Sequence, residues 1–290
     1  FCLSRGLGDV YKRQDKSKAF EQFKNRIANQ RLNDKREREN FCLSKFWRYA
    51  AVIVILFSVS YFSYWRGGIS IKEVFSDIIV EAPLGSRTKL TLPDGTLVWL
   101  NAGSRITYSQ GFGVGNRKIE LIGEGYFEVK RNEEVPFLVK TNSLLVKVLG
   151  TKFNFRDYPD DAEAVVSLSE GKVSLNNLLK KEKEAFLLPN ERVVLNKKNG
   201  RMHVEYSTVS NALQWTNGYL FFDEELLPDV VKELERSYNV KIQIASDTLN
   251  TFRFYGNFVH REQNIQEVLE ALSATRKIHY IIEGHNITLY

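Results

Sequence analysis

Residues 88–101 have the sequence TKLTLPDGTLVWLN, in which apolar and polar residues alternate on both sides of a Pro-Asp-Gly-Thr segment. A period of two is the pattern of a half-buried β-strand. In the middle segment the proline fixes φ, the aspartate side chain accepts backbone hydrogen bonds, and the glycine tolerates a positive φ. The stretch therefore predicts a β-hairpin, and the alternation predicts the side chains that meet across its turn: Leu90 and Leu92 opposite Leu97 and Trp99.

Strand-like segments continue on the C-terminal side of this hairpin. They lie at 117–130, 136–141, 144–158, 162–175, 184–196 and 202–206. Glycine, proline and asparagine separate them, and no convincing helical periodicity interrupts them. We therefore expect an all-β domain over about 70–206, either sandwich-like or partly solenoidal.

The segment 213–290 has a different pattern, in which strands and helices alternate. Residues 226–238 repeat their apolar positions at helical spacing, with Pro228 suited to the first turn. A second helical pattern starts at Ile265 and runs to about Arg276. The expected order is β-α-β-β-α-β-β, which predicts a small α+β domain with both helices on one face of a sheet.

Residues 49–65, YAAVIVILFSVSYFSYW, contain no charged side chain and are bracketed by Arg48 and Arg66. As a helix this run would be about 26 Å long, close to the thickness of a bilayer's hydrocarbon core. Tyrosine and tryptophan gather at both ends, as they do at membrane boundaries. The run predicts a transmembrane helix. A buried core helix is the alternative, because the run is short for a span and contains three serines.

The charge of the chain is distributed unevenly around that run. Residues 1–48 contain 13 Lys/Arg and 6 Asp/Glu, a balance of +7, whereas residues 49–290 contain the other 28 Lys/Arg and 29 Asp/Glu, a balance of −1. This asymmetry predicts a cytoplasmic N-terminus and a periplasmic C-terminal part, in a single pass through the bacterial inner membrane. A basic arm that binds nucleic acid is the rival interpretation of the same charge. The only cysteines, Cys2 and Cys42, exclude a disulfide framework after the run.

The N-terminal part itself has two sections. Residues 1–14 show no periodicity, and their FCLS recurs at 41–44, so we interpret them as a doubtful, non-native segment. Residues 15–48 are basic, and apolar residues recur at helical spacing in their first part: Phe20, Phe23 and Ile27. A short helix cannot bury such a stripe alone, so these residues are candidates for docking on a partner or on the inner leaflet. A solvated linker is an equal alternative for 33–45.

Several phrases follow one another in an order that resembles FecR-type proteins. They are APLGSRTKLTLPDGTLVWLNAGSRITY (82–108), RKIELIGEGYFEV (117–129), VLGTKFNF (148–155), VSLSEGKVSL (166–175) and LLPNERVVL (187–195). FecR-type proteins are single-pass anti-sigma factors or sigma regulators of the inner membrane. The segment 213–290 resembles the domain at the end of Bacteroidetes-type FecR-like chains, which is similar to the short N-terminal domains of secretins and TonB-dependent receptors.

The resemblance implies a signalling role and two kinds of partner. An outer-membrane TonB-dependent transducer would signal to the C-terminal domain, and the N-terminal segment would hold a cytoplasmic extracytoplasmic-function (ECF) sigma factor, with Phe20, Phe23 and Ile27 as candidate contacts. Regulated proteolysis by site proteases would follow the signal. In some FecR-like regulators the chain cleaves itself at a Gly-Thr step, which here is Gly150-Thr151. The sigma-binding region is shorter here than in the family, so residues 15–48 resemble a remnant of it.

Residue patterns suggest one further interaction site, on a strand. They also suit the cleavage step, for which they allow an ordinary structural explanation as well. The segment TFRFYGNFV (251–259) reads as an edge strand whose second face carries Arg253, Tyr255 and Asn257, which are candidates for transducer binding. At Gly150-Thr151 a threonine hydroxyl next to an unhindered carbonyl suits an N→O acyl shift. A bulged strand entry explains the same dipeptide without any chemistry.

The sequence contains no pattern that predicts an enzyme or a cofactor. The four histidines lack metal-ligand spacing, and the glycines of GFGVGN (111–116) lack a following helix that would hold a phosphate. Two sets of carboxylates are interpreted as solvated faces: Glu120, Glu124 and Glu128, and Asp223, Glu224 and Glu225. The alternative function is an envelope module that binds glycan or peptidoglycan in a cleft lined by aromatic residues. A glycan hydrolase would need paired carboxylates in a cleft.

Overall fold

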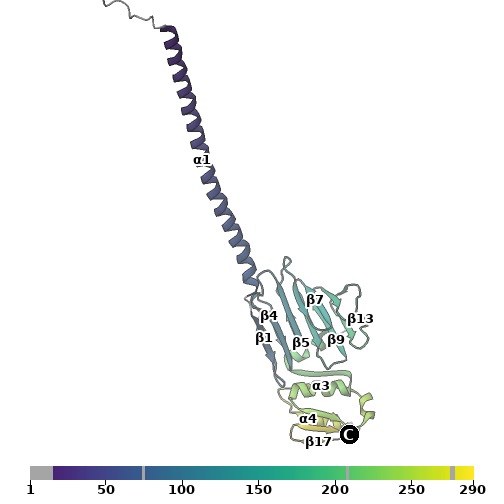
Figure 1. The fold of residues 1–290 in the computed structure, drawn as a ribbon. Helices are drawn as coiled ribbons and strands as arrows, with labels where there is room; N and C mark the ends of the chain where they lie inside the picture. Colours follow the sequence, from purple (N-terminus) through teal and green to yellow (C-terminus); the bar gives the residue numbers. More distant parts are fainter. Residues whose placement is uncertain (1–15, 74–75, 207–208, 275–277) are drawn as a thin grey trace, which may run out of the picture. The chain divides into compact units, whose positions relative to one another are not determined.

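The computed structural model describes residues 16–73, 76–206, 209–274 and 278–290 (Figure 1). By its internal contacts the chain divides into two compact units, residues 1–74 and 75–290. Residues 1–14, interpreted above as non-native, lie outside the described residues. The second unit contains a large β domain followed by a small α+β domain, as the sequence predicts.

The first unit contains one continuous helix, α1 (Lys16–Glu73), of 58 residues. The amphipathic segment, the linker expected at 33–45 and the uncharged run at 49–65 are successive parts of this helix. No proline or glycine occurs between residue 16 and Gly67, so nothing in the backbone chemistry ends the helix earlier. The backbone at 33–45 is helical, and the interpretation of this segment as a solvated linker stays a prediction.

No helix in the described part of the chain is both long and apolar enough to cross a membrane. The transmembrane helix predicted at 49–65 is thus not confirmed. The uncharged run comprises only 17 residues, three of them serines, and the sequence is charged immediately before and after it.

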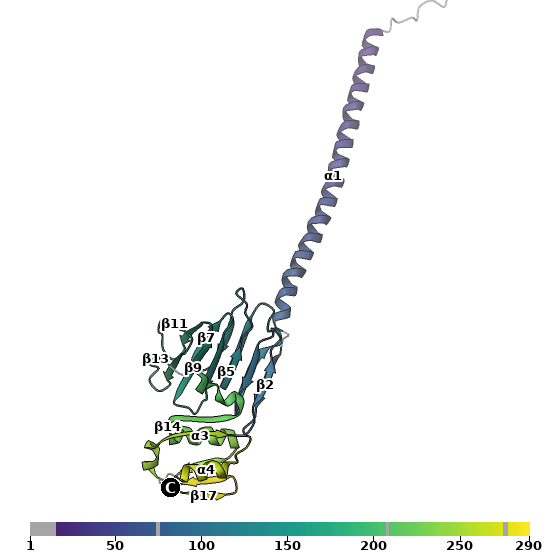
Figure 2. The same ribbon diagram turned by 180° about the vertical axis from the view of Figure 1, so that it is seen from behind.

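The β domain consists of two sheets that share one strand. Its strands are β1 (Asp77–Ala82), β2 (Thr88–Thr91), β3 (Leu97–Leu100), β4 (Ser104–Ser109), β5 (Arg117–Glu128), β6 (Phe137–Lys140), β7 (Leu144–Val148), β8 (Lys152–Asp157), β9 (Glu163–Glu170), β10 (Val173–Asn177), β11 (Ala185–Leu187), β12 (Glu191–Asn196) and β13 (Met202–Tyr206). One sheet runs β1-β4-β5-β6-β7-β10-β11 and the other β2-β3-β5-β8-β9-β12-β13. The result is a near-barrel rather than a solenoid (Figures 1 and 2).

One hydrophobic core fills the space between these two sheets. Phe127 and Phe153 stack with their ring centroids 5.1 Å apart, and Phe137 from the other sheet lies 6.3 Å from Phe127. All three side chains are fully buried. Because such aromatic pairs add packing energy beyond their buried area, they hold the two sheets together.

The predicted hairpin at 88–101 is present as β2 and β3, but its register differs from the prediction. Leu90 pairs with Val98, not with Leu97 or Trp99. The turn closes with Leu92 and Thr96 facing each other, so the inward set is Leu90, Leu92, Val98 and Leu100. Trp99 lies on the opposite face of the sheet, where Lys89 covers its ring at 4.5 Å.

Strand β5 changes neighbours at Gly123. Before this residue β5 pairs with β4 and β6, and from this residue on it pairs with β8 and then β3. Gly123 has φ of +98°, and a Cβ there would lie 2.4 Å from Ser104 Oγ. Only glycine fits this position, and the kink directs the residue that follows, Glu124, toward the C-terminal domain.

The C-terminal domain has the predicted order of elements. They are α2 (Val209–Ala212), a 3₁₀ turn (Gln214–Asn217), β14 (Tyr219–Leu226), α3 (Leu227–Tyr238), β15 (Lys241–Ile244), a 3₁₀ turn (Asp247–Thr251), β16 (Arg253–Val259), α4 (Ile265–Ser273), β17 (Tyr280–Glu283) and β18 (Asn286–Leu289). Pro228 lies in the first turn of α3, and Asn239 ends this helix in the left-handed conformation. Asn264 and Glu267 form a capping box on α4.

The strands of this domain form two small sheets, not the single sheet that the sequence suggested. β14 pairs with β16, whereas β15 pairs in parallel with β18, which also pairs with β17. The register of β14 shifts between Phe222 and Glu225, and Glu224 there has a positive φ of 56°. This bulge interrupts the pairing of β14 with β16. Helix α3 lies on the side of the domain nearest the β domain (Figure 1).

Candidate functional site

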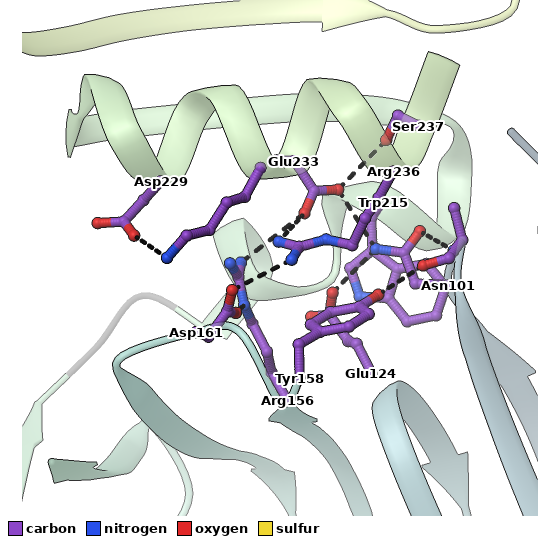
Figure 3. A network of polar contacts seen from close by, with 12 residues as sticks. Asn101, Glu124, Arg156, Tyr158, Asp161, Trp215, Asp229, Glu233, Arg236 and Ser237 are labelled. Carbon is purple, nitrogen blue, oxygen red and sulfur yellow. Dashed lines mark hydrogen bonds and ion pairs between the residues drawn. The ribbon is translucent and has the colours of Figure 1, made fainter. Parts of the chain in front are cut away.

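A cluster of buried polar side chains joins the β domain to helix α3 (Figure 3). We call it the interdomain network, and its members are Asn101, Ser104, Glu124, Asn154, Arg156, Tyr158, Asp161, Trp215, Glu233 and Arg236. They come from β4, β5, β8, the segments that follow β3 and β8, the 3₁₀ turn before β14, and α3. Polar groups at such depth are retained only if they pair with one another.

Glu124 is held by two neutral amides. Its Oε1 accepts a hydrogen bond from Asn154 Nδ2 at 2.8 Å, and its Oε2 accepts one from Asn101 Nδ2 at 2.9 Å. Asn154 in turn accepts a hydrogen bond from Trp215 Nε1 at 3.1 Å. Glu124 is only 5% exposed, and none of the described residues forms an ion pair with it.

Asn101 connects the two domains directly. Its Nδ2 also lies 3.4 Å from Glu233 Oε1 on α3, so one amide group bridges a carboxyl of each domain. Its Oδ1 accepts hydrogen bonds from Ala102 N at 2.9 Å and from Arg87 Nε at 3.0 Å. The amide is thereby fixed in one orientation, and its two sides cannot be exchanged.

Glu233 is surrounded by positive charge, unlike Glu124. Arg236 Nη2 lies 3.3 Å from its Oε2, and Arg156 Nη1 lies 3.9 Å from the same oxygen. Ser237 Oγ donates a hydrogen bond to Oε1 at 3.3 Å. The carboxylate therefore has counter-charges from its own helix and from β8 across the domain boundary.

Arg236 reaches from α3 into the β domain. Its Nη1 pairs with Asp161 at 3.1 Å, and its guanidinium carbon lies 3.9 Å above the ring of Tyr158. Asp161 also pairs with Arg156 at 2.8 Å, so one carboxylate takes two guanidiniums. A guanidinium that is stacked and paired in this way is held more rigidly than a lysine would be.

The hydroxyl of Tyr158 closes the network on the side of the β domain. It donates to Ala102 O at 2.9 Å and accepts from Ser104 Oγ at 3.1 Å. Ser104 Oγ also accepts from the backbone N of Glu124 at 2.8 Å. The backbone turn at 101–104 is thus tied to both β5 and the segment after β8.

The two buried carboxyls titrate in opposite directions. Burial raises the pKa of Glu124, and the positive charge of Arg156 offsets only part of that effect. Burial would also raise the pKa of Glu233, but Arg156, Arg236 and Arg87 outweigh it and hold that pKa below its usual value. The pKa of Glu124 therefore lies above that of Glu233, so Glu124 is the first of the two to take up a proton as the pH falls.

Such a pair of carboxyls also occurs in enzymes, but the surroundings here suit a joint between domains. The cavity that touches Glu124 and Glu233 has a volume of about 120 Å³, below the range in which ligands bind. The described residues contain no group of His, Cys, Asp and Glu that could hold a metal ion. The contacts of Glu233 with Asn101 and Arg156 cross the domain boundary and fix α3 to the β domain.

The interpretation of Glu120, Glu124 and Glu128 as one solvated face is wrong for Glu124. Glu120 is exposed and pairs loosely with Lys118 at 3.5 Å. Glu128 is half-buried, with its Oε1 3.3 Å from the hydroxyl of Tyr126. The face that these residues share is open to water at one end only, because α3 and the turn at Trp215 cover the part around Glu124. Asp223 and Glu224 are exposed, as expected, whereas Glu225 is half-buried.

The structure gives Gly150 and Thr151 a packing role. A Cβ at Gly150 would lie 2.7 Å from the backbone Cα of Arg131, so the position requires glycine. Thr151 is 3% exposed, and its Oγ1 donates to Lys172 O at 3.0 Å. Cleavage at this step stays a prediction.

The other sequence-predicted contacts lie on exposed surfaces. Arg253, Tyr255 and Asn257 share one exposed face of β16, where Tyr255 and Arg253 both contact Glu224 of the bulge. On α1, Phe20 and Phe23 are 65% and 61% exposed, and Ile27 is half-buried. Their roles in binding stay predictions.

The sequence contains a pattern that indicates this network. The interpretation of Glu120, Glu124 and Glu128 as a solvated face did not take it into account. Asn101 ends the phrase VWLN, Glu124 lies within GEGYFEV, and Asn154 lies between two phenylalanines in KFNF. In each phrase a polar residue stands among residues that face a core. Three such residues in separate strands indicate one shared buried cluster, because each needs a partner.

Comparison with known proteins gives matches along most of the second unit. The family model described as FecR protein matches residues 79–174, and the one described as FecR, C-terminal, matches residues 219–289. Two crystal structures of a candidate anti-sigma factor from Parabacteroides distasonis match with 33% identity and a TM-score of 0.68. The matches cover 73% and 74% of this chain and 98% and 99% of the solved chains. No curated protein matches. Both family models match in order, and the match to the solved relative covers 98% of that chain. The chain therefore belongs to the FecR family and contains a FecR C-terminal domain.

Proposed function

We propose that this protein is an anti-sigma factor or sigma regulator. It relays a signal from an outer-membrane TonB-dependent transducer to a cytoplasmic ECF sigma factor. The observation that carries the proposal is the match of the whole second unit to a candidate anti-sigma factor. FecR-family proteins are generally regulators and not enzymes. Sigma factor and transducer are inferred from the family resemblance.

The interdomain network supplies a physical route for such a relay. A partner that binds the C-terminal domain in one state more tightly than in another shifts the equilibrium between those states. Glu233 and Arg236 connect α3 to Arg156 and Asp161 of the β domain, so a displacement of α3 breaks several charged contacts at once. The β domain therefore responds to events at the C-terminal domain.

The sigma-binding part of the proposal is tested at the N-terminal helix. Phe20 and Phe23 present exposed aromatic rings on α1, and exposed rings of this size are suited to docking. We expect co-purification of an ECF sigma factor encoded beside this gene with the full chain. The triple substitution of Phe20, Phe23 and Ile27 to Asp should abolish the capture.

The matched control for that experiment places three Asp on the exposed polar positions Gln22, Asn25 and Asn29 of the same helix. This control adds the same negative charge without removing apolar surface. Equal capture by the triple variant and by the wild-type chain would refute the site. Loss of capture in the control as well would assign the effect to charge.

We propose further that the protein is attached to the inner membrane, as FecR-family proteins typically are, with the basic N-terminal segment in the cytoplasm and residues 77–290 in the periplasm. The charge balance of +7 before residue 49 and −1 after it supports this orientation. So do the exposed apolar side chains along 51–65. Protease added to spheroplasts should remove the C-terminal part and leave the N-terminal segment. Protection of both parts would contradict the orientation.

In the periplasm, we propose that the face of Arg253, Tyr255 and Asn257 contacts the transducer. The three side chains are exposed and adjacent on β16. Tyr255→Ser should weaken capture of the transducer's periplasmic signalling domain. Tyr206→Ser, at an exposed position on β13 of the β domain, is the control. Capture that is equal for both variants and the wild type would exclude this face.

Self-cleavage at Gly150-Thr151 is a separate proposal with its own test. It requires that the Thr151 hydroxyl leave its hydrogen bond to Lys172 O and attack the carbonyl carbon of Gly150. An ester then replaces the peptide bond and the Thr151 nitrogen becomes a free amine. Water hydrolyses the ester, which leaves a new carboxylate on Gly150 and restores the Thr151 hydroxyl. On a denaturing gel, the purified chain should show two fragments, and Thr151→Ala should show one full-length band. A single band in both proteins would show that the dipeptide serves packing alone.

A further inference from the structure

A cleft of about 340 Å³ lies beside the interdomain network and is distinct from the surfaces discussed above. The segment 85–89 forms one wall, and residues 215–218 and 260–261 form the other. Its charged and aromatic lining consists of Arg87, Lys89, Trp99, Trp215, His260 and Arg261. The volume is at the lower end of the range for small-molecule sites and suits a ligand of monosaccharide size.

Every charged side chain of the described residues that line this cleft is a cation. Three cationic side chains, Arg87, Lys89 and Arg261, line it, and no Asp or Glu of the described residues does. In the described part of the chain none of these three forms an ion pair. Cations that line one cleft repel one another, and an anion between them would relieve this repulsion.

Arg87 provides the second observation. Its Nε donates to Asn101 Oδ1 at 3.0 Å, but its Nη2 is buried and has no hydrogen-bond partner. A buried guanidinium N–H without an acceptor is costly, because it has lost water and gained nothing. Burial lowers the pKa of Arg87, and the carboxyls of Glu233 and Glu124 offset only part of this effect.

The aromatic residues give the cleft an apolar wall and a rigid shape. Lys89 Nζ lies 4.5 Å above the ring of Trp99, which holds the ammonium group near the cleft. Trp215 is fixed by its hydrogen bond to Asn154, and His260 Nε2 donates to Ser237 O at 2.7 Å. The polar partners of these rings are thus already in place before any ligand binds.

We propose that this cleft binds a small oxyanion, a carboxylate or phosphate group, with Arg87, Lys89 and Arg261 as its counter-charges. The guanidinium of Arg87 would donate to the anion while its Nε keeps the hydrogen bond to Asn101. The ligand would thereby be linked to Glu124 and Glu233 through a single amide. This site does not depend on the proposed sigma factor or transducer.

Calorimetric titration of the full chain with glucuronate, inorganic phosphate and glucose tests the proposal. Glucuronate represents a carboxylate on a ring, phosphate a free oxyanion, and glucose the same ring without the charge. We expect saturable binding of at least one of the two anions with a Kd of millimolar or tighter, none of glucose, and weakening with added NaCl. Binding of glucuronate would identify a carboxylate as the bound group, and binding of phosphate would identify a phosphate.

The double substitution Lys89→Gln and Arg261→Gln should weaken that binding about tenfold or more, since two charge-assisted contacts are lost. Both residues are exposed, so the fold is retained, and an unchanged thermal midpoint verifies this. Lys147→Gln with Lys198→Gln, exposed and outside the cleft, should bind as the wild type does. Absence of saturable anion binding, equal binding of glucose, or undiminished binding by the double variant would each overturn the proposal.

Discussion

Glu124 shows how strongly one residue's chemistry depends on what covers it. In a bare strand it would be an ordinary surface carboxyl, but in this protein it is buried and accepts hydrogen bonds from two amides. Its raised pKa means that folding favours the protonated form. The stabilising effect is complete below the usual pKa of 4.5 and is lost as pH rises through the pKa of the folded state.

The substitution Glu124→Gln should therefore change the pH dependence of stability. Above pH 4.5 the free energy of unfolding of the wild type should fall relative to that of the variant, by up to about 1.4 kcal/mol per pH unit. Denaturant unfolding followed by tryptophan fluorescence at several pH values measures this. Glu120→Gln, on the exposed part of the same strand, should run parallel to the wild type. Parallel profiles for Glu124→Gln as well would show that the buried carboxyl does not titrate differently on folding.

Asn101 offers a second prediction on the same scale. Asn101→Ala removes the donor that Glu124 and Glu233 share and the acceptor of Arg87 Nε. We expect a loss of about 2–4 kcal/mol in the free energy of unfolding, because buried charged groups lose their partners. Asn142→Ala, at an exposed position between β6 and β7, should change it by less than about 0.5 kcal/mol. A similar small change at Asn101 would mean that water replaces the amide.

Individual residues were the least predictable part of this protein. Alternation along β5 correctly placed Glu120 and Glu124 on one face, but it contained no information about the α3 helix that covers part of that face. The pairing of Leu90 was wrong by one position on the opposite strand, because the turn closes between Leu92 and Thr96. A turn's closing pair depends on backbone geometry that residue types only partly specify.

The backbone of a single strand can constrain the arrangement of its neighbours, and β5 is the clearest example. A strand that pairs with β4 and β6 in its first half and with β3 and β8 in its second half must turn between them. Gly123 makes this turn with a positive φ and with Ser104 in the space of a side chain. The kink thus determines both the sharing of β5 between two sheets and the position of Glu124.

Gly123→Ala should destabilise the chain by about 2 kcal/mol or more, since it adds backbone strain and a steric clash. Gly113→Ala is a matched control, because Gly113 also has a positive φ (+91°) but open space where its Cβ would be. The control should cost about 1 kcal/mol from strain alone. Chemical denaturation of the two variants measures the difference, and equal losses would show that Ser104 moves aside.

At this scale the sequence was informative where periodicity was strong. The hairpin at 88–101 and the order of elements in 213–290 follow from alternation, helical spacing and turn residues. The length of α1 was not predicted, because a change from amphipathic to uncharged composition looked like a boundary, although no residue there breaks a helix. The bulge at Glu224 within the β14–β16 pair was not predicted either, because a glutamate rarely has a positive φ.

Across the whole second unit, the interdomain network makes the β domain and the C-terminal domain mutually dependent. Charged groups buried between them have no alternative partners, so opening the boundary leaves several of them unpaired together. We therefore expect the two domains to lose their hydrogen-exchange protection together, as one cooperative unit.

Arg236→Met tests this expectation, because it keeps much of the side-chain volume and removes the pairs with Asp161 and Glu233. Amide exchange should accelerate both in α3 and in the strand ends at Glu124 and Arg156. Arg192→Met breaks a half-exposed pair with Glu205 elsewhere in the β domain and should cost less than about 1 kcal/mol. Faster exchange confined to α3 would mean that the domains unfold independently.

The distance in sequence between the two halves of the network has a consequence for the newborn chain. Asn101 and Glu233 are 132 residues apart, so the ribosome delivers the β domain long before α3. Glu233, on α3, is one of the groups that raise the pKa of Glu124. The docking of α3 therefore favours proton uptake at Glu124, which links this late step of maturation to the acidity of the compartment in which it happens.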